Sequence, residues 1–197
     1  MGLGAAGGRY EVPISKIQQL MGMGGDNLLP EAIHVEKDTD EGKKLSRRCA
    51  EIFEAKYLAG IQPFPAAKAL VEKVSADNYQ VTVASSGNAA IVDKMIAIVD
   101  IAALLSTKAD SPDAKKSKPN PDIILATLDK LVMRPEETLM LGDTPYDISA
   151  TGKAGVGVIA LRCGGFTDEE LKGAVAIYND AADLLANHDS SPLKRSA

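Results

Sequence analysis

Residues 138–147 read TLMLGDTPYD, and this stretch decides the fold class of the chain. Four residues, 138–141, favour a short buried strand, and two carboxylates, Asp143 and Asp147, follow the strand directly. Outward from this stretch, short apolar segments alternate with helical patterns from residue 61 onwards. The pattern predicts strands at 80–84, 101–105, 138–141, 156–161 and 174–178, and helices at 63–74, 88–99, 121–131, 148–154 and 181–187. This alternation indicates an α/β fold: a three-layer, Rossmann-like parallel sheet between helices.

The preceding residues 14–60 show no strand pattern. Apolar residues recur there at helical spacing, and a glycine-rich loop at 22–26 is followed by a short apolar helix near 27–33. This part therefore predicts a small helical module. Residues 188–197 are polar, which favours a disordered tail.

The composition excludes several functional classes. The 197 residues include 27 acidic and 22 basic ones, for a net charge of −5, and no basic face typical of nucleic-acid binding is evident. Two cysteines, far apart in the sequence, support neither a disulfide scaffold nor a metal or redox motif. No apolar run approaches the length of a membrane helix, and no signal peptide is visible, so the cytoplasm is the expected location. The oligomeric state is left open.

The informative polar residues follow the predicted strands. Ser85, Ser86 and Gly87 come after strand 80–84, and a hydroxyl with free backbone N–H groups at a strand-to-helix turn can bind phosphate oxygens. Lys118, in the segment SKPNPD at 117–122, can add a positive charge for a phosphoryl group or a carboxylate. Each segment alone is also a common turn or capping sequence.

Asp143 and Asp147 lie four residues apart at the end of a predicted strand. Two carboxylates in this position suit Mg²⁺, which takes few protein ligands and keeps several waters. Parallel strands collect ligands at their carboxyl ends, so the three polar segments are expected to meet at one edge of the sheet. The order, spacing and shared position of these segments favour a phosphate-handling site over three unrelated turns.

These motifs resemble those of the haloacid dehalogenase superfamily of phosphohydrolases, in the branch with a small helical cap that includes phosphoglycolate phosphatases and β-phosphoglucomutases. VTVASSGN resembles the second motif of that family, SKPNPD the third and LMLGDTPYD the fourth, and QLMGMGGDNLLP resembles its cap segment. The similarity covers about residues 9–187. It implies domain boundaries at 1–12, a remnant of the segment leading into the cap, 13–62, the helical cap, and 63–187, the core, before the tail at 188–197.

The resemblance also implies a mechanism. An aspartate attacks the phosphoryl group and forms an aspartyl-phosphate, and a second aspartate acts as acid and base. Ser85 would bind phosphoryl oxygens, Lys118 would steady the nucleophile and the phosphate, and Asp143 and Asp147 would hold Mg²⁺. The cap loop would select a small phosphorylated metabolite through Gly22, Met23, Gly24, Gly25 and Asp26.

The sequence departs from the family at its first motif, an apolar strand followed by Asp-x-Asp-Gly-Thr, which precedes the cap. No such segment occurs in the 197 residues, and residues 38–42, DTDEG, open a charged helix rather than follow a buried strand. The chain is therefore expected to be inactive as it stands.

Three explanations of this departure are open: a longer natural protein, a non-catalytic relative that binds phosphate compounds or a partner, and a protein completed by a segment from another chain. The first is favoured, because MGLGAAGG at 1–8 resembles neither a strand nor a replacement for one. For the complete protein we expect hydrolysis of phosphoglycolate or a sugar phosphate, with a mutase activity as an alternative.

Overall fold

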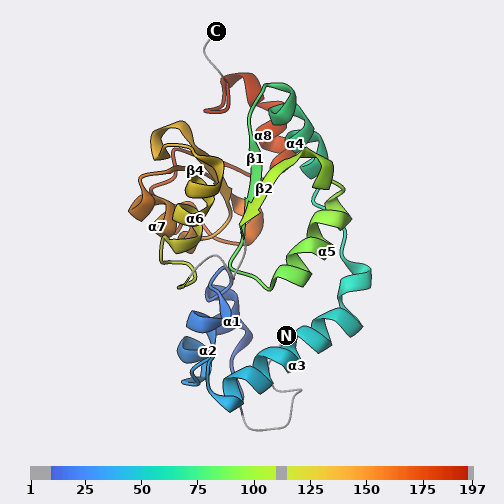
Figure 1. Cartoon of the computed structure of the whole chain (residues 1–197), viewed down its shortest axis with the longest axis vertical. Coiled ribbons are helices and arrows are strands. Elements are labelled where there is room, and N and C mark those ends of the chain that lie inside the picture. Colours follow the sequence, from blue (N-terminus) through green and yellow to red (C-terminus); the bar gives the residue numbers. More distant parts are fainter. Residues whose placement is uncertain (1–9, 110–114, 195–197) are drawn as a thin grey trace. The chain divides into compact units, whose positions relative to one another are not determined.

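The computed structural model describes residues 10–109 and 115–194. The chain divides into two compact units, Met1–Ile61 and Gln62–Ala197. The boundary thus lies one residue before the expected one, which was after residue 62. Each unit is described below by itself, and Figure 1 labels their elements.

The first unit is helical. Its elements are α1 (Ile14–Gln19), α2 (Gly25–Ile33), α3 (Asp40–Lys56) and a 3-10 turn at Leu58–Gly60. Helix α3 begins where the Thr39 hydroxyl accepts a hydrogen bond from the Gly42 N–H at 3.1 Å, with Asp40 and Glu41 in the first turn. Residues 38–42 are therefore a helix start, as expected.

The second unit alternates strands and helices. Its helices are α4 (Ala67–Ala76), α5 (Ala89–Val99), α6 (Asp122–Leu131), α7 (Pro145–Ala154) and α8 (Ala181–Ala186). Its strands are β1 (Val81–Ala84), β2 (Leu105–Ala109), β3 (Leu139–Gly142), β4 (Gly157–Leu161) and β5 (Ala176–Tyr178). The described residues of this unit also form four short 3-10 turns, at Ala102–Leu104, Pro135–Glu137, Arg162–Gly164 and, after the last helix, His188–Ser190.

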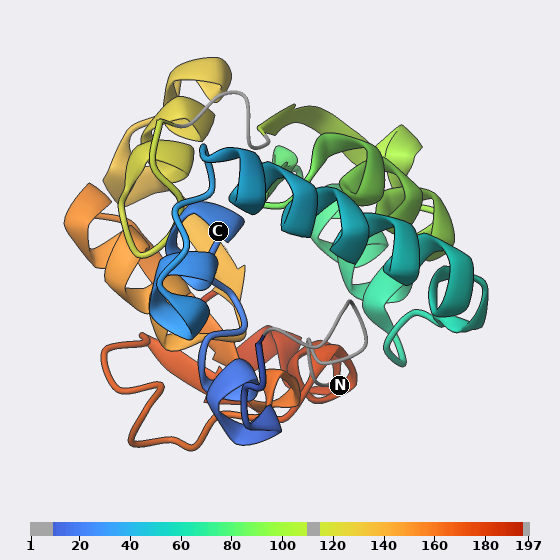
Figure 2. The ribbon, with the colours of Figure 1, turned by 90° about the horizontal axis from the view of Figure 1, so that it is seen from below.

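All described strand pairs are parallel, but they form two sheets. One sheet pairs β1 with β2, and the other has the order β3-β4-β5. Helices cover both faces of the second sheet. Ile159 of β4 packs with α4 and α8, while the next residue, Ala160, packs with Ile148 of α7. Helices α6 and α7 lie side by side in both views (Figures 1 and 2). The expected helix–sheet–helix layering is thus confirmed.

Two expectations about the chain are wrong. The strand expected at 101–105 lies at Leu105–Ala109, because Ile101 packs against α5 and a 3-10 turn occupies Ala102–Leu104. The tail is ordered over 188–194: Leu193 is buried against α4 and α8, and its carbonyl accepts a hydrogen bond from the Tyr79 hydroxyl at 2.9 Å. Residues 195–197 lie outside the described part.

None of the described helices combines the length and the apolar character that a membrane crossing requires.

Candidate active site

A buried ion pair lies at the carboxyl ends of the strands of the second unit. The Lys118 Nζ is 2.7 Å from Asp147 Oδ1, and the two residues are only 7% and 4% exposed. The same Nζ donates to the Ala84 carbonyl, the last residue of β1, at 3.4 Å. Lys118 thus contacts both the β1 end and the segment that follows β3.

Both carboxylate oxygens of Asp147 are engaged. Oδ1 accepts from Lys118, and Oδ2 accepts from the backbone N–H groups of Asp143 and Thr144, each at 3.1 Å, and from the Thr144 hydroxyl at 2.8 Å. Thr144 caps α7, since its hydroxyl oxygen also accepts from the Asp147 N–H at 3.2 Å. This closed network holds Asp147 at the helix N-terminus, where a negative charge is favoured.

The approach of α7 to β3 depends on a glycine. A Cβ added at Gly142 would lie 2.6 Å from the Asp147 Cβ, which is closer than any real contact. A side chain at position 142 would therefore displace the carboxylate that holds Lys118.

The phosphate-binding candidates lie after β1 and are tied mostly to their own loop. The Ser85 hydroxyl oxygen accepts from the Gly87 N–H at 3.1 Å, and Ser86 Oγ accepts from the Lys118 N–H at 3.3 Å. Asn88 caps α5 by accepting from the Ala90 N–H at 3.0 Å. Ser85, Ser86 and Gly87 therefore lie at the start of α5 and beside the Lys118 segment.

Asp143 is partly buried next to the ion pair. Burial raises the pKa of its carboxyl group, the neighbouring Asp147 carboxylate raises it further, and Lys118 opposes both effects. Its backbone is also closely packed: a Cβ added at Gly164 would lie 2.1 Å from the Asp143 carbonyl oxygen. A carboxylate that is costly to keep charged in this position is one that a cation would stabilise.

The carboxylates of Asp143 and Asp147, the two expected Mg²⁺ ligands, differ in how available they are to a metal. Asp143 can offer a carboxylate to Mg²⁺, which needs one or two protein carboxylates and otherwise keeps water. In this structure Asp147 accepts from Lys118 and from three N–H and O–H donors, so direct ligation of a metal would require it to give up one of them, and its assignment as a metal ligand stays a prediction. Within the described ranges, no group of three or more His, Cys, Asp or Glu side chains is placed to hold a metal.

Two residues of this site were not predicted. Thr144 has a local signal, because a threonine three residues before an aspartate at a helix start is a capping pattern. Gly164 has none, since it is distant in sequence and acts only through its small size.

The expected selectivity loop lies in the other unit. Gly22 has a positive φ of 102°, and Met23 forms an isolated β-bridge with Met21. Gly24 is the N-cap residue of α2, so this helix begins at Gly25 rather than at residue 27. Asp26 lies in the first turn of α2. The role of Gly22, Met23, Gly24, Gly25 and Asp26 in substrate selection stays a prediction.

Comparison with known proteins identifies the family. The family described as haloacid dehalogenase-like hydrolase matches residues 5–161. The chain belongs to the haloacid dehalogenase-like hydrolase family. This confirms both the resemblance and the fold class, a Rossmann-like α/β core with a helical cap.

Individual members of the haloacid dehalogenase-like family agree with this. A phosphoglycolate phosphatase of Photorhabdus laumondii is 26% identical over 91% of this chain and 79% of its own length. The crystal structure of a hydrolase from Pseudomonas syringae is 27% identical, covers 95% of this chain and 87% of its own, and has a TM-score of 0.85. CbbY from Rhodobacter sphaeroides, in complex with xylulose-(1,5)bisphosphate, shares the fold at a TM-score of 0.76 and 21% identity over 92% and 85% of the two chains. The family and the Photorhabdus relative indicate a hydrolase of the phosphatase type.

Proposed function

We propose that this chain supplies the phosphate-binding and metal-binding groups of a phosphatase that hydrolyses a small phosphate monoester. One observation carries the proposal: the buried Lys118–Asp147 pair, which joins the end of β1 to the segment after β3. A buried lysine held by a fully hydrogen-bonded carboxylate is a fixed positive charge, and fixed charge is what phosphoryl transfer requires of a protein.

The described groups have separate roles in this proposal. Lys118 stabilises charge on the phosphoryl oxygens, and Asp147 holds Lys118 in place. Ser85, with the N–H groups at the start of α5, binds phosphoryl oxygens. Asp143 binds Mg²⁺ together with water, and the bound cation would offset negative charge on the phosphate. Two carboxylates against one ammonium leave this centre negative, so a dianionic phosphate needs the cation there.

The proposed reaction proceeds through an aspartyl-phosphate. A carboxylate oxygen forms a bond to phosphorus as the ester P–O bond breaks and the alcohol leaves, and water then cleaves the acyl phosphate. The 197 residues contain no apolar strand followed by Asp-x-Asp that could supply this carboxylate. The chain alone is therefore expected to be inactive, since loss of a nucleophile lowers the rate by about 10⁶.

The proposed substrate class is phosphoglycolate or a sugar phosphate. The Photorhabdus relative is named a phosphoglycolate phosphatase, and CbbY is titled as a complex with a sugar bisphosphate. The loop at Gly22–Asp26 would select among such esters, and a mutase-type reaction on a sugar phosphate is the alternative within this class.

Turnover of p-nitrophenyl phosphate with Mg²⁺ tests the function. We expect none above background from this chain, and activity from a version extended at the N-terminus by an apolar strand ending in Asp-x-Asp-Gly-Thr. That activity should be lost in Lys118→Ala, and Asp129→Ala on the exposed side of α6 serves as a control. Robust turnover by the unextended chain, abolished in Asp143→Asn, would contradict the assignment of the nucleophile.

A second candidate function is phosphate-ligand binding without turnover. It is favoured by the same geometry, because Lys118 and Ser85 are in place without the nucleophile. Calorimetric titration of the unextended chain with phosphoglycolate separates the two candidates. Binding that is lost in both Lys118→Ala and Ser85→Ala supports a binding module, and an absence of heat supports an incomplete enzyme.

A further inference from the structure

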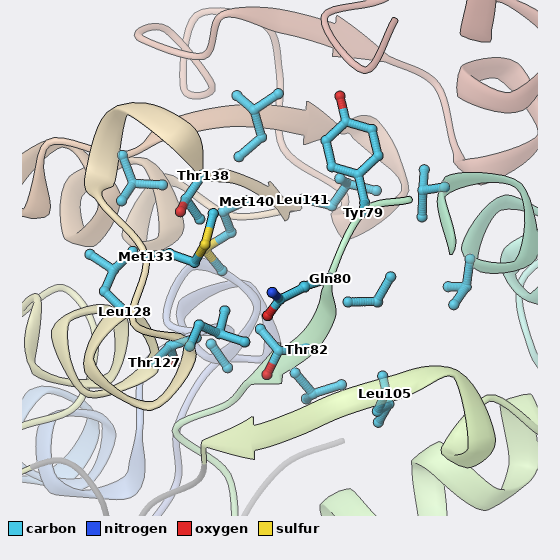
Figure 3. Close-up of a pocket in the computed structure, with 18 of the residues that line it drawn as sticks. Tyr79, Gln80, Thr82, Leu105, Thr127, Leu128, Met133, Thr138, Met140 and Leu141 are labelled. Atoms are coloured by element: carbon cyan, nitrogen blue, oxygen red, sulfur yellow. The ribbon is translucent and has the colours of Figure 1, made fainter. Parts of the chain in front are cut away.

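A cavity of about 460 Å³ lies between β1 and β3 in the α/β unit. Figure 3 shows Thr82 of β1 and Met140 of β3 on opposite sides of this space. Among the described residues that line it, Glu137 is the only charged one, and it is paired with Arg134 at 2.8 Å. A phosphate group would find no cation in this cavity, so further groups that assist phosphate binding lie outside it.

Residues 116–122 form a turn that is closed by its own hydrogen bonds. The Lys116 N–H donates to Asp122 Oδ2 at 3.0 Å. Within the turn, the Asn120 N–H and the Asn120 side-chain amide both donate to the Ser117 carbonyl, at 3.0 and 3.1 Å. A turn that is closed at its ends and in its middle moves as one unit, so a contact at one of its residues orients the others.

Two neighbours hold this turn, and the hydrogen bonds to one of them are shorter. On the β1 side, the Lys118 N–H and Nζ donate to the Ser86 hydroxyl and to a β1 carbonyl, at 3.3 and 3.4 Å. On the α7 side, the Lys118 Nζ donates to Asp147 Oδ1 at 2.7 Å, and the Lys153 Nζ donates to the Pro119 carbonyl at 2.7 Å. Short bonds from an ammonium group are the strong ones, so α7 determines the position of the turn more than β1 does.

Helix α7 holds the turn at two points. Asp147 lies in the first turn of the helix and Lys153 in the last, about 9 Å apart along the axis. A lysine in the last turn of a helix is favoured by the helix dipole alone. The Lys153 side chain, however, reaches out of α7 to Pro119, the residue after Lys118. The same helix thus binds the side chain of one residue of the turn and the carbonyl of the next.

We infer that Lys153 is a positioning residue for Lys118: its bond to the Pro119 carbonyl fixes where the Lys118 ammonium lies at the phosphate-binding site. This inference rests on the proposed role of Lys118 in phosphate binding. Without the bond, Lys118 would keep Asp147 as its partner, but the backbone that carries Lys118 would be free to shift relative to Ser85. Lys153 itself is exposed and acts only through the turn.

Three single variants separate the effect of the bond from the effect of the charge. Lys153→Met keeps an unbranched stem but removes the donor. Lys153→Arg keeps both a donor and the positive charge. Lys130→Met is the matched control, because Lys130 of α6 also donates to a backbone carbonyl, that of Lys108 at 3.1 Å, and the substitution removes the same charge.

Nuclear magnetic resonance of the ligand-free chain measures the position of the turn. We expect hydrogen exchange of the Lys118 and Asn120 amides to rise about fivefold in Lys153→Met, because the turn has lost one of its contacts. The nitrogen-15 resonance of the Lys118 ammonium should shift in the same variant. Both signals should stay close to wild type in Lys153→Arg and Lys130→Met. Exchange of the Val158 amide in β4 should not change in any variant, since β4 is paired on both edges.

Calorimetric titration with inorganic phosphate and Mg²⁺ measures the consequence for binding. We expect about fivefold weaker binding in Lys153→Met, and binding within about twofold of wild type in Lys153→Arg and Lys130→Met. A loss that reflects charge alone would appear in both methionine variants and would decrease with added salt.

The two measurements have separate outcomes. An unchanged ammonium resonance and unchanged amide exchange of Lys118 in Lys153→Met would overturn the inference. Faster exchange with unchanged phosphate affinity would overturn it as well, because Lys153 would then be a structural contact only. A wild-type chain that gives no heat with phosphate would count against phosphate binding by this chain alone, and the Lys118 signals of the ligand-free variants would still decide whether Lys153 positions Lys118.

Discussion

Strands β4 and β1 have similar apolar sequences but different surroundings. β4 is paired on both edges, by β3 and β5, and its Val158, Ile159 and Ala160 are 2%, 0% and 0% exposed. Among the residues that the structure describes, β1 is paired only with β2, and all four of its residues are half-buried. Of these two strands, the one that is paired on both edges is the more deeply buried.

Two contacts join the β1–β2 sheet to the part of the unit built around the β3–β4–β5 sheet. At the carboxyl end of β1, Lys118 bonds both the Ala84 carbonyl and Asp147. At the other end, Tyr79 bonds the carbonyl of Leu193, which packs into the cluster beneath β3 and β4. The four predictions below test this arrangement, from the largest expected effect to the smallest.

The largest effect is expected from breaking the carboxyl-end contact. Lys118→Met keeps the apolar stem but leaves the Asp147 carboxylate buried without its cation, so the free energy of unfolding should fall by about 3–5 kcal/mol. Urea unfolding followed by circular dichroism measures this loss. The double variant Lys118→Met/Asp147→Asn should recover at least half of it, and a loss that the second change only deepens would show that the charge of Asp147 is not the cause.

A matched pair of substitutions tests the strand comparison directly. Val158→Ala in β4 removes two buried methyl groups and leaves a cavity, so we expect a loss of about 2 kcal/mol. Val83→Ala in β1 removes the same groups from a half-buried position, and the loss should stay below about 1 kcal/mol. Equal losses in urea unfolding would mean that the open edge does not loosen packing around β1.

Local patterns were sufficient for much of this unit. Strands β1, β3, β4 and β5 were located from short apolar runs bounded by glycine and polar residues, because such runs are typical of buried strands in a parallel sheet. The strand-end residues Lys118, Asp143 and Asp147 were found because parallel strands end at a common edge. These inferences needed only neighbours in sequence.

The remaining features depended on contacts between distant residues. Asp147 was expected to bind a metal, but its oxygens are filled by Lys118 and Thr144, and residue type alone cannot reveal which partner occupies a carboxylate. The tail was expected to be disordered, yet Leu193 finds an apolar site against α4 and α8. The break between the two sheets has no signal in the β1 sequence itself, since VTVA suits both a central strand and an edge strand, but it agrees with the lack of a first-motif strand in the 197 residues.

A smaller effect on the free energy of unfolding is expected from the contact of Tyr79, just before β1. Tyr79→Phe removes the hydroxyl that bonds the Leu193 carbonyl but keeps the ring, so the loss of unfolding free energy should be about 1 kcal/mol. Hydrogen exchange should rise mainly in residues 188–194, as their anchor to the β1 side is lost. Tyr57→Phe in the helical unit is the control, and an equal effect there would mean that the Tyr79 contact does not anchor the tail.

The smallest expected effect is a gain in stability, and it follows from the raised pKa of Asp143. A carboxyl group whose pKa is raised by folding favours the folded state when it is protonated, so its contribution falls as pH rises from its ordinary pKa through its pKa in the fold. At neutral pH, Asp143 therefore opposes folding, and Asp143→Asn should raise the unfolding free energy by less than about 1 kcal/mol after allowance for solvent screening. Below the ordinary carboxyl pKa the two proteins should have equal stability, because Asp143 is then neutral in both the folded and the unfolded state.

Urea unfolding without Mg²⁺, at neutral pH and at a pH below the ordinary carboxyl pKa, measures this difference in stability. Asp129→Asn is the control, because it removes a carboxylate from an exposed position. Added Mg²⁺ should stabilise the wild-type chain and not the variant, because a cation relieves the same repulsion that the substitution removes. If the Asp143→Asn chain were instead less stable at neutral pH, the carboxylate would be a structural partner within the β3 half rather than a ligand held ready at its edge.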